Sequence, residues 1–446
     1  MGKIYYSTPN ADYYFYASNK IIRVIEFASR ICYDAGDKIT EDSWYKYIMN
    51  RVKSGHESVT EHGIVSVIID LSKMDNEIEQ KQIIDIENVF AGMRIRNTYD
   101  NSIFTFRTKL HYCCEPGWNK LSPESHMMII SGNVKMWRDF IKAYIATGHF
   151  HGNVTISILD TVIELFRFYD HMGWGGIFTS DIPELIANSN LVKSCKTLLY
   201  PGTGLQHRID DPELIPLINL NFCDMIYAQR PRDVSELTED EINNNINIDF
   251  GTTSRLISCD NIPTDMLLFN KVVDIPYFTQ FIHAHILDIS SVTYWIRMPR
   301  IVSQQEARHR ENSISQRSQR YVNEFKKPGG VYVPDSIKNS QVREYNTKTN
   351  VDKSMEDIYL EMVNEAFKCY DKLVSSGIPK EDARNILPGG VYTQMVVTKP
   401  FYTLPHYFKE RTSKAAQFEI REPAIALKKY LNDKFSYIKD GRPLFE

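Results

Sequence analysis

Residues 308–321 read RHRENSISQRSQRY, a short stretch that concentrates positive charge. Four arginines and one histidine fall within it, with serines interleaved among them. Guanidinium groups offer planar pairs of hydrogen-bond donors, and serines add hydroxyl donors on short side chains. This combination is suited to binding phosphate groups. A solvated charged face or a nonspecific nucleic-acid patch would have the same composition. No comparable basic run occurs elsewhere in the chain, which argues against nucleic acid, because useful affinity there needs many phosphate contacts.

The spacing within this stretch is more specific than its composition. Residues 308–310 (RHR), seven further residues and then Ser318 give the pattern RHR-x7-S, which continues to Arg320 and Tyr321. This pattern resembles the signature of the flavin-dependent thymidylate synthases, the ThyX family. Many members have Asn-Glu before the x-Ser, whereas this chain has Ser315-Gln316, as other members do. Any role normally given to that glutamate is therefore in doubt here.

Three further blocks match the family in the same order along the chain. They are GHESVTEH at 55–62, ARNILPGGVYT at 383–393 and LPHYFKERTSKAAQFEIR at 404–421. The resemblance covers roughly residues 20–72 and 281–431. It implies an α/β (α+β) fold with a central mixed sheet flanked by helices, in a homo-oligomer whose sites form between subunits.

The same resemblance implies an activity. It implies conversion of dUMP to dTMP, with FAD as the bound cofactor and with NADPH and 5,10-methylenetetrahydrofolate as co-substrates. None of the seven cysteines lies in the four quoted blocks, and Cys32, in the matched range 20–72, stands where family members often have serine, so the alternative route, in which a cysteine attacks the uracil ring, is not indicated. Two other interpretations stay open. One is a related enzyme that makes another C5-modified pyrimidine nucleotide such as hydroxymethyl-dUMP, and the other is a non-catalytic nucleotide- or nucleic-acid-binding relative.

Roles for single residues follow from their places in the matched blocks. The resemblance implies that Arg411 faces the uracil carbonyl and stabilises developing negative charge, with Ser318 and His56 as the other candidate catalytic residues. The candidate residues for dUMP are Gln305, Arg308, Gln316, Ser318, Arg320, Arg384 and Arg411. The candidate residues for FAD are His56, Ser58, Glu61, Asn133, Arg308, His309, Arg310 and His406. No cluster of residues indicates a metal site.

One expected segment is missing from its usual place. Family members usually have Asn-x-Arg before the L-x-H block, but here Pro400 and Tyr402 occupy those positions. Residues 131–140, SGNVKMWRDF, resemble the missing segment, with Asn133 and Lys135 in the matching positions. An ordinary helix start with Asn133 as N-cap explains the same letters, and both interpretations stay open.

The chain is about twice as long as a minimal ThyX subunit, which raises the question of a repeat. The echoes are SRI at 29–31 with SRL at 254–256, IDLS at 69–72 with LDIS at 287–290, and RIR at 94–96 with RHR at 308–310. They predict a diverged tandem duplication with a first unit at 1–205, which keeps part of the flavin wall, and a second unit at 206–446, which carries the motif and the nucleotide site. The alternative is a single unit with an insertion of roughly 200 residues between Leu71 and Phe281. A duplicated chain would form a homodimer of pseudo-dimers and a single unit a homotetramer.

The overall composition is typical of a globular protein. Hydrophobic residues make up 43% and charged residues 24% of the 446 positions, and the net charge of −4 gives no global attraction to nucleic acid or to anionic membrane. No window of eighteen uncharged apolar residues occurs, and residues 1–14 lack the apolar run of a secretory signal. The cysteines are scattered without a C-x-x-C pair, which favours reduced thiols in the cytoplasm.

Apolar periodicity predicts the main elements. Helices are expected over 19–33, 41–54, 128–145, 155–170, 353–376 and 414–431, a strand over 64–71, a glycine C-cap at Gly55 and a linker over 201–212.

Overall fold

The fold is described by a computed structural model. It describes residues 3–7, 12–17, 21–40, 43–70, 111–112, 127–147, 162–163, 165–167, 170, 177–178, 247–248, 252–260, 291–309, 312–347, 351–434 and 443–446. The expected unit boundary at 205/206, the expected linker at 201–212, the RIR sequence at 94–96 and Arg310 lie outside the described residues.

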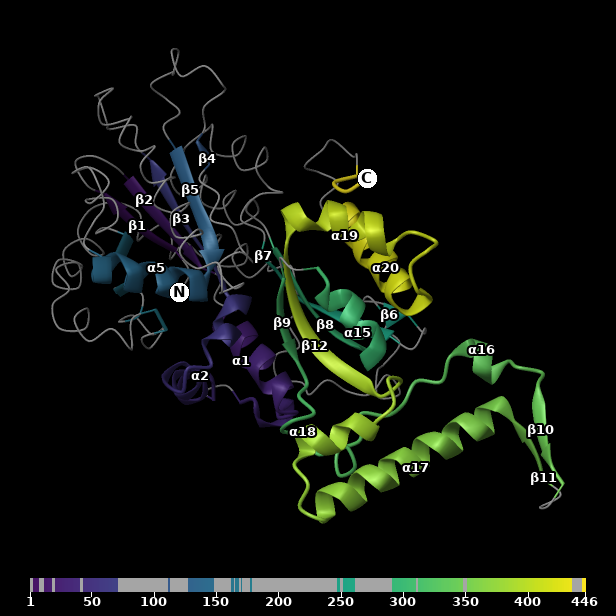
Figure 1. Ribbon diagram of the computed structural model, residues 1–446. Helices are drawn as coiled ribbons and strands as arrows, with labels where there is room; N and C mark the ends of the chain where they lie inside the picture. The colour runs from purple at the N-terminus through teal and green to yellow at the C-terminus, as the bar shows by residue number, and fades with distance from the viewer. Residues whose placement is uncertain are drawn as a thin grey trace.

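Two five-stranded sheets organise the described part of the chain (Figure 1). The first contains β1 (Lys3–Ser7), β2 (Asp12–Ala17), β3 (Ile64–Asp70), β4 (His111–Tyr112) and β5 (Met127–Asn133) in the order β1-β2-β3-β5-β4. The second contains β6 (Asn247–Ile248), β7 (Thr252–Asp260), β8 (Ser291–Pro299), β9 (Ser313–Gln316) and β12 (Tyr392–Pro400) in the order β6-β7-β8-β12-β9. The expected combination of helices and sheets is confirmed. The expected mixed strand directions are not found, because every pair of described neighbouring strands is antiparallel.

Helices connect and cover these sheets. In the first half they are α1 (Ile21–Cys32), η1 (Gly36–Lys38), α2 (Trp44–Lys53), η2 (Glu57–His62) and α5 (Val134–Thr147). In the second half they are α15 (Arg300–Ala307), α16 (Asp335–Lys338), α17 (Met355–Ser375), α18 (Lys380–Ala383), η6 (Arg384–Ile386), η7 (Phe401–Thr403), α19 (Leu404–Arg411) and α20 (Phe418–Lys434). A separate hairpin of β10 (Arg343–Asn346) and β11 (Val351–Ser354) precedes α17.

Most expected elements form close to their predicted bounds. The helices at 19–33, 41–54 and 353–376 are found as α1, α2 and α17, and the strand at 64–71 as β3, whose described part ends at Asp70. Gly55 has a φ of 79°, the left-handed conformation expected of a glycine C-cap. The helix expected over 414–431 begins at Phe418, and within the expected helix at 155–170 residues 162, 163 and 165–167 are helical.

The helix expected over 128–145 is wrong in its first part. Residues 127–133 form β5, which pairs along its whole length with β3, so that Ile130 lies opposite Val67. Ser131 and Gly132 are weak helix formers, and long-range pairing therefore overrides an apolar pattern that fits either structure. The helix begins only at Val134.

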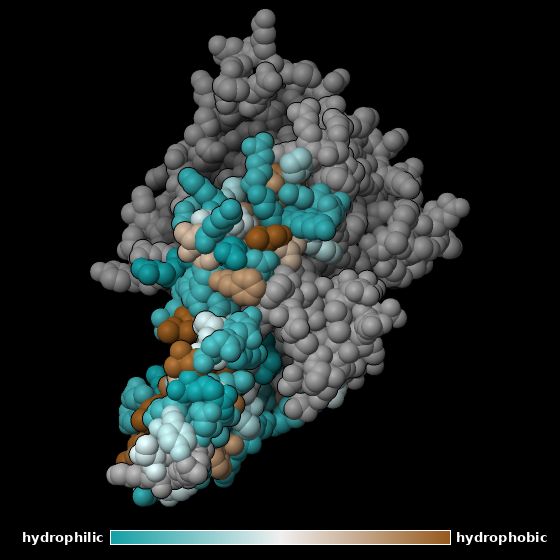
Figure 2. All heavy atoms as spheres, turned by 90° about the vertical axis from the view of Figure 1, so that its right-hand side faces the viewer, coloured by the Kyte–Doolittle hydropathy of each residue, from teal (hydrophilic) through white to brown (hydrophobic). Residues whose placement is uncertain are grey.

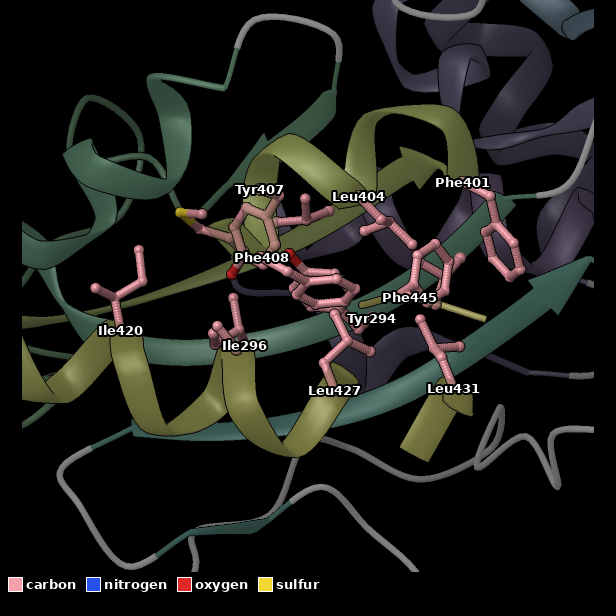
Figure 3. Packing of buried hydrophobic residues seen from close by; sticks show 14 of the residues in the cluster. Tyr294, Ile296, Phe401, Leu404, Tyr407, Phe408, Ile420, Leu427, Leu431 and Phe445 are labelled. Carbon is pink, nitrogen blue, oxygen red and sulfur yellow. The ribbon is translucent and has the colours of Figure 1, made fainter. Parts of the chain in front are cut away.

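The second sheet is covered on both faces. Side chains alternate along β8, so that Tyr294 and Ile296 enter a large core with α19, α20 and the chain end (Figure 3). Trp295 belongs to a separate core cluster on the opposite face. On that opposite face Trp295 and Val396 pack against Ala28 and its neighbours on α1. A helix from the first half of the sequence thus completes the packing of the second sheet. Burying each such side chain contributes roughly 1.5–3 kcal/mol.

An arm made of α16, the β10–β11 hairpin and α17 extends away from the second sheet (Figure 1). Helix α17 begins with a capping box at Ser354 and Asp357, and only Val363 and Tyr370 are reported buried along it. Figure 2 shows a mainly hydrophilic face with separate hydrophobic spots. Single exposed apolar side chains of this kind are normal on a protein surface. Among the described residues, no helix is both long and apolar enough to cross a membrane.

Candidate functional site

The junction between β8 and α15 places the first candidate residues. Pro299 ends β8 and is the N-cap of α15. The backbone N–H groups of Arg300 and Ile301 donate to the backbone oxygens of Val391 and Gly389, which fixes the start of the helix to the neighbouring loop. The carboxyl end of α15 then carries Gln305 and the beginning of the RHR motif.

Helix α19 brings a distant block to this end of α15. The Arg411 guanidinium donates from Nε to Nε2 of His309 at 2.9 Å and from Nη2 to the backbone oxygen of Gln305 at 3.1 Å. The Gln305 amide donates to Oε1 of Gln417 at 2.7 Å. The rings of His309 and His406 lie 6.0 Å apart. Residues from two matched blocks, together with Gln305, therefore form one group, which we call the α15–α19 cluster: Gln305, His309, His406, Arg411 and Gln417.

His309 in this cluster is a neutral ring at neutral pH. Burial lowers its pKa to about 4, and the charges of Lys399 and Arg411 act in the same direction. Because Nε2 accepts from Arg411, the single ring proton is on Nδ1. The central residue of the motif is therefore an oriented acceptor and not a third cation.

A buried ion pair lies beneath the α15–α19 cluster. The Lys399 ammonium forms an ion pair with Oε1 of Glu306 at 2.8 Å, and both side chains are fully buried. Glu306 also accepts from the hydroxyls of Tyr294 at 2.6 Å and Tyr407 at 3.0 Å. Burial alone would raise the pKa of Glu306, but the Lys399 ammonium and the hydrogen bond from Tyr294 hold that pKa below its usual range. The Tyr407 ring also contacts the His309 ring at 4.8 Å, so this network supports the floor of the cluster.

This network of Glu306, Lys399 and the two tyrosines was not predictable from the sequence. Glu306 lies two residues before the motif, and Lys399 lies near the end of an apolar strand. Neither position indicates in the sequence that the fold buries the two side chains together.

A second group of candidate residues lies at the loop after β9. Arg320 donates from Nε to Oε2 of Glu381 at 2.8 Å, and Arg384 donates from Nε to the backbone oxygen of Glu381 at 3.1 Å. The Ser318 hydroxyl accepts from the backbone N–H of Arg320 at 3.2 Å. We call Ser318, Arg320, Glu381 and Arg384 the Glu381 cluster. The Arg320 side chain is 56% exposed, so an anion from solvent can reach its guanidinium.

The two clusters are distinct in the structure. The α15–α19 cluster lies at the carboxyl end of α15, whereas the Glu381 cluster is built from the loop after β9 and from α18 and η6. Gln316 at the end of β9 donates to the hydroxyls of Ser303 at 2.9 Å and Thr393 at 3.2 Å. It therefore ties α15 to β12, a role that the sequence did not predict.

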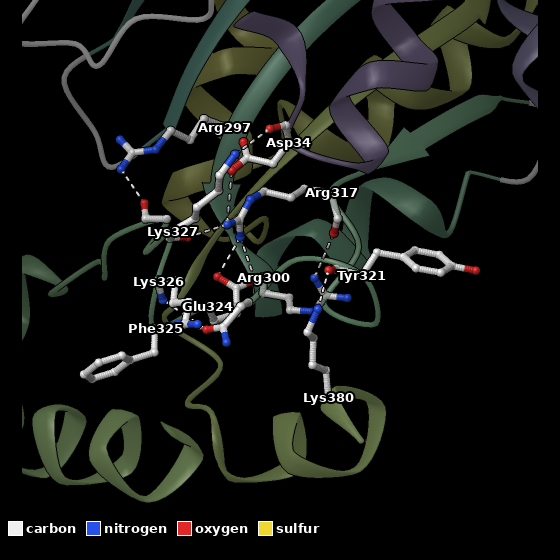
Figure 4. A network of polar contacts seen from close by, with 12 residues as sticks. Asp34, Arg297, Arg300, Arg317, Tyr321, Glu324, Phe325, Lys326, Lys327 and Lys380 are labelled. Atoms are coloured by element: carbon white, nitrogen blue, oxygen red, sulfur yellow. Dashed lines mark hydrogen bonds and ion pairs between the residues drawn. The ribbon is translucent and has the colours of Figure 1, made fainter. Parts of the chain in front are cut away.

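Arg317 is not available to a ligand. It is 2% exposed and donates to both carboxylate oxygens of Glu324 at 2.6 Å and to the backbone oxygen of Lys327 at 2.6 Å (Figure 4). Asp34 of the first half approaches the same guanidinium at 3.6 Å. One of the four arginines in the basic stretch therefore shapes the loop and does not face solvent.

The segment GHESVTEH at 55–62 has some side chains at the surface and others in the interior. His56 and Ser58 are exposed, and no hydrogen bond or ion pair of their side chains is found within the described part of the chain. Glu61 is buried. His62 is buried as well, with Nδ1 at 2.8 Å from the hydroxyl of Thr398 and Nε2 at 2.9 Å from that of Ser315. The segment therefore ties the first half to β9 and β12 of the second sheet.

Asn133 has the position of a helix cap. It ends β5, and its Oδ1 accepts from the backbone N–H of Met136 at 2.7 Å. The side chain is fully buried. Asn133 is thus the N-cap of α5, as one of its two interpretations predicted, and a contact of its side chain with flavin stays a prediction.

Arg308 is the C-cap of α15 and is exposed. Within the described residues its guanidinium has no hydrogen bond or ion pair, so it can bind an anion without losing a partner. Arg310, the third residue of the motif, lies outside the described residues. No group of three or more possible metal ligands occurs in the parts of the chain that the structure describes.

Known proteins resemble the part of the chain that holds both clusters. Residues 264–435 match the family described as thymidylate synthase complementing protein, Thy1. The second half of the chain carries a Thy1 domain. This confirms the resemblance that the RHR-x7-S pattern indicated, and the Thy1 domain includes both clusters. His56, Ser58, Glu61 and Asn133 lie outside the matched residues.

Curated relatives of the Thy1 domain are flavin-dependent thymidylate synthases. The one from Pyrococcus abyssi is 33% identical over 153 residues, which is 34% of this chain and 58% of that protein. The one from Sulfurisphaera tokodaii is 36% identical over 147 residues, 32% of this chain and 50% of that protein. The match thus spans little more than half the length of these relatives. A solved UMP/dUMP methylase from Streptomyces cacaoi, bound with 5-Br dUMP, is 21% identical with a TM-score of 0.30, covering 41% of this chain and 90% of that one.

Proposed function

We propose that this protein is a flavin-dependent thymidylate synthase that converts dUMP to dTMP. FAD would be its bound cofactor, methylenetetrahydrofolate its carbon donor and NADPH the reductant that recharges the flavin. The observation that carries the proposal is the α15–α19 cluster, because it joins the RHR motif to Arg411 through a 2.9 Å hydrogen bond inside the Thy1 domain.

The available side chains fit the proposed ligands. Arg308 is an exposed guanidinium without a partner among the described residues, as a phosphate or pyrophosphate site requires. Exposed His56 and Ser58 add a ring and a hydroxyl in the segment proposed to face the flavin. FAD supplies the hydride when bound. Arg308, His309, Arg310 and His406, with His56, Ser58, Glu61 and Asn133, would hold it.

The nucleotide would be held mainly by the Glu381 cluster. Arg320 and Arg384 would bind the phosphate of dUMP, with Ser318 as a hydroxyl donor and Arg308 close to both ligands. Arg320 is hydrogen-bonded to the Glu381 carboxylate in the structure. To bind the phosphate of dUMP, its guanidinium must therefore exchange that carboxylate for the phosphate. Gln305 and Gln316 would contact the base edge.

Arg411 would act on the reacting ring. Its guanidinium is oriented by His309 and by the backbone of Gln305, so it needs no rearrangement before it meets developing negative charge on a uracil carbonyl. Fixing the donor in advance is the main source of such electrostatic catalysis. The neutral state of His309 matters here, because a protonated ring could not accept from Arg411.

The deciding experiment uses the purified full chain. We expect a yellow protein with a flavin absorption spectrum, which converts dUMP to dTMP when supplied with methylenetetrahydrofolate and NADPH, as followed by mass spectrometry of the nucleotide. A product heavier by one oxygen would identify hydroxymethyl-dUMP and replace the proposal with the alternative enzyme. Absence of both flavin and product would exclude both enzymatic functions. The proposed setting is the cytoplasm, where cysteines stay reduced.

A further inference from the structure

The two sheets share one strand order. If the strands of each sheet are numbered in chain order, leaving aside the separate β10–β11 hairpin, both sheets read first, second, third, fifth, fourth. Every neighbouring pair is antiparallel in both. Figure 1 shows the two sheets as separate bodies with α1 between them.

The register agrees as well as the order. In the first sheet Ile64, which begins the third strand, pairs with Asn133, which ends the fifth. In the second sheet Ser291 begins the third strand and pairs with Pro400, which ends the fifth. A helical segment starts at the next residue in both cases. This equivalence sets Asn133 against Pro400.

The helices that follow bury equivalent positions. Counting from Asn133 and from Pro400, the fourth, seventh and eighth residues are buried in both helices. These residues are Trp137, Phe140 and Ile141 in α5, and Leu404, Tyr407 and Phe408 in α19. An insertion into a single unit has no physical reason to repeat the strand order, the register and the buried helix face of its host.

The short similar sequences noted above do not support this repeat. Residues 29–31 lie in helix α1, whereas 254–256 lie in strand β7, so that echo is wrong. Residues 69–70 end β3, whereas 287–290 precede β8, so the second echo does not join equivalent positions either.

We propose that the chain consists of two units of one fold, at 1–205 and 206–446, in which the first unit is the built-in partner of the second and the pair forms one ligand site, with its nucleotide-binding residues in the second unit. The number of sites rests on the proposed function. Where the second unit has His406 and Arg411, the first has Asp139 and Tyr144 at the equivalent positions. Asp139 is held in an ion pair with Lys135 at 2.7 Å. A carboxylate repels an anion and a phenol carries no positive charge, so these two side chains cannot replace the histidine and arginine of the second unit in binding an anionic ligand.

The contact between the units shows the partner role. Helix α1 covers the face of the second sheet that its own helices leave open. Its carboxyl end reaches the motif loop, where the backbone oxygen of Cys32 accepts from the N–H of Ser318 at 3.0 Å. Burial raises the pKa of the Cys32 thiol, and the nearby Ser315 hydroxyl acts on that pKa in the opposite direction. Beside it, His62 bonds to Ser315 and Thr398.

A single substitution tests the pairing without any ligand. In the full chain, Ser315→Cys places a second thiol beside Cys32, and mild oxidation should join the two within one chain. Peptide mass spectrometry under non-reducing conditions identifies the bridge, and the electrophoretic mobility shows whether it is within or between chains. The Cys32→Ser/Ser315→Cys protein is the matched control and should form no such bridge. A bridge between two chains, or none at all, would overturn the built-in pairing.

The number of sites is tested on the unmodified protein. We expect one FAD and one dUMP per chain, from absorption spectroscopy and titration calorimetry, and a dimer of chains by light scattering. Two ligands per chain, or a tetramer of chains, would overturn the division between the units. A protein that binds neither FAD nor dUMP would overturn the proposed function and the single site together, while the bridge at position 315 would still decide the pairing.

Discussion

Arg411 and His309, 102 residues apart in the chain, are joined by a 2.9 Å hydrogen bond between Nε and Nε2. The bond orients a guanidinium with a neutral ring, so the positive charge stays on Arg411. Because helix α19 carries Arg411 and the end of α15 leads into His309, any change that separates these helices disturbs both residues at once.

Replacing Arg411 should slow catalysis more than it weakens folding. For Arg411→Ala we expect kcat/KM for dUMP to fall about 100- to 1,000-fold, the usual cost of removing one oriented donor from a developing charge. Arg411→Lys should be intermediate, because a lysine keeps the charge but not the planar donors. Lys409→Ala, an exposed cation on the same helix, is the control and should retain wild-type turnover. Equal losses in both alanine variants would remove Arg411 from the mechanism.

The buried ring of His62 should make the free energy of unfolding depend on pH. Burial lowers its pKa to about 3, against 6.5 for an unperturbed histidine. Between these values the unfolded chain binds a proton that the folded protein cannot, so this contribution to stability is complete above pH 6.5 and is lost progressively as the pH falls toward 3. The total is a few kcal/mol, since one pKa unit corresponds to about 1.4 kcal/mol.

Denaturant unfolding of wild type and His62→Gln between pH 8 and 4 isolates this contribution from that of the carboxylates. The difference in unfolding free energy between the two proteins should shift in favour of the variant as the pH falls below 6.5. A difference that stays constant over the whole range would show that His62 is not buried as a neutral ring.

The buried ion pair of Glu306 and Lys399 should be sensitive to removal of one partner. Lys399→Met leaves a buried carboxylate with only two tyrosine hydroxyls, at an expected cost of about 3–5 kcal/mol in unfolding free energy. Adding Glu306→Gln should recover much of that loss, because no uncompensated charge then stays buried. Lys353→Met, which breaks an exposed pair, should cost at most about 1 kcal/mol. A double variant no more stable than the single one would contradict the charge argument.

The exposed pair of Arg320 and Glu381 should regulate access of the nucleotide phosphate. Glu381→Gln frees the guanidinium from its competing carboxylate, so dUMP should bind more tightly, whereas Arg320→Ala should weaken dUMP binding and spare flavin binding. Calorimetric titration of both variants measures this, with Arg343→Ala on the β10–β11 hairpin as a distant control. Weaker dUMP binding in Glu381→Gln would mean that the carboxylate itself contacts the nucleotide.

Asn133 has a structural role and a proposed flavin role, and two variants separate them. Asn133→Ala should cost about 1 kcal/mol through loss of the helix cap. Asn133→Ser restores a capping oxygen and should recover stability, but it should not recover flavin affinity if the amide contacts the cofactor. Wild-type flavin affinity in the serine variant would leave Asn133 with the capping role alone.

Local patterns determined much of this protein without help from the fold. The helices α1, α2 and α17, the strand β3 and the glycine C-cap at Gly55 follow from apolar spacing and from residue conformational preferences, which act over a few neighbours. The RHR-x7-S spacing also predicted the family that residues 264–435 match, because a spacing of this kind is a local property of the sequence.

Only the tertiary structure decided how these parts are used. Residues 127–133 became a strand because β3 offered them a complete set of backbone partners, and that choice is invisible in a pattern that also fits a helix. Arg317 is buried because Glu324 pairs with its charge, although its place in the basic stretch suggested a ligand contact. His62 is buried because Thr398 and Ser315 form hydrogen bonds with its ring, a role that the sequence did not predict. The strand order that the two sheets share is likewise a long-range property. The similar residues at 29–31 and 254–256 did not predict it, because the first lie in a helix and the second in a strand.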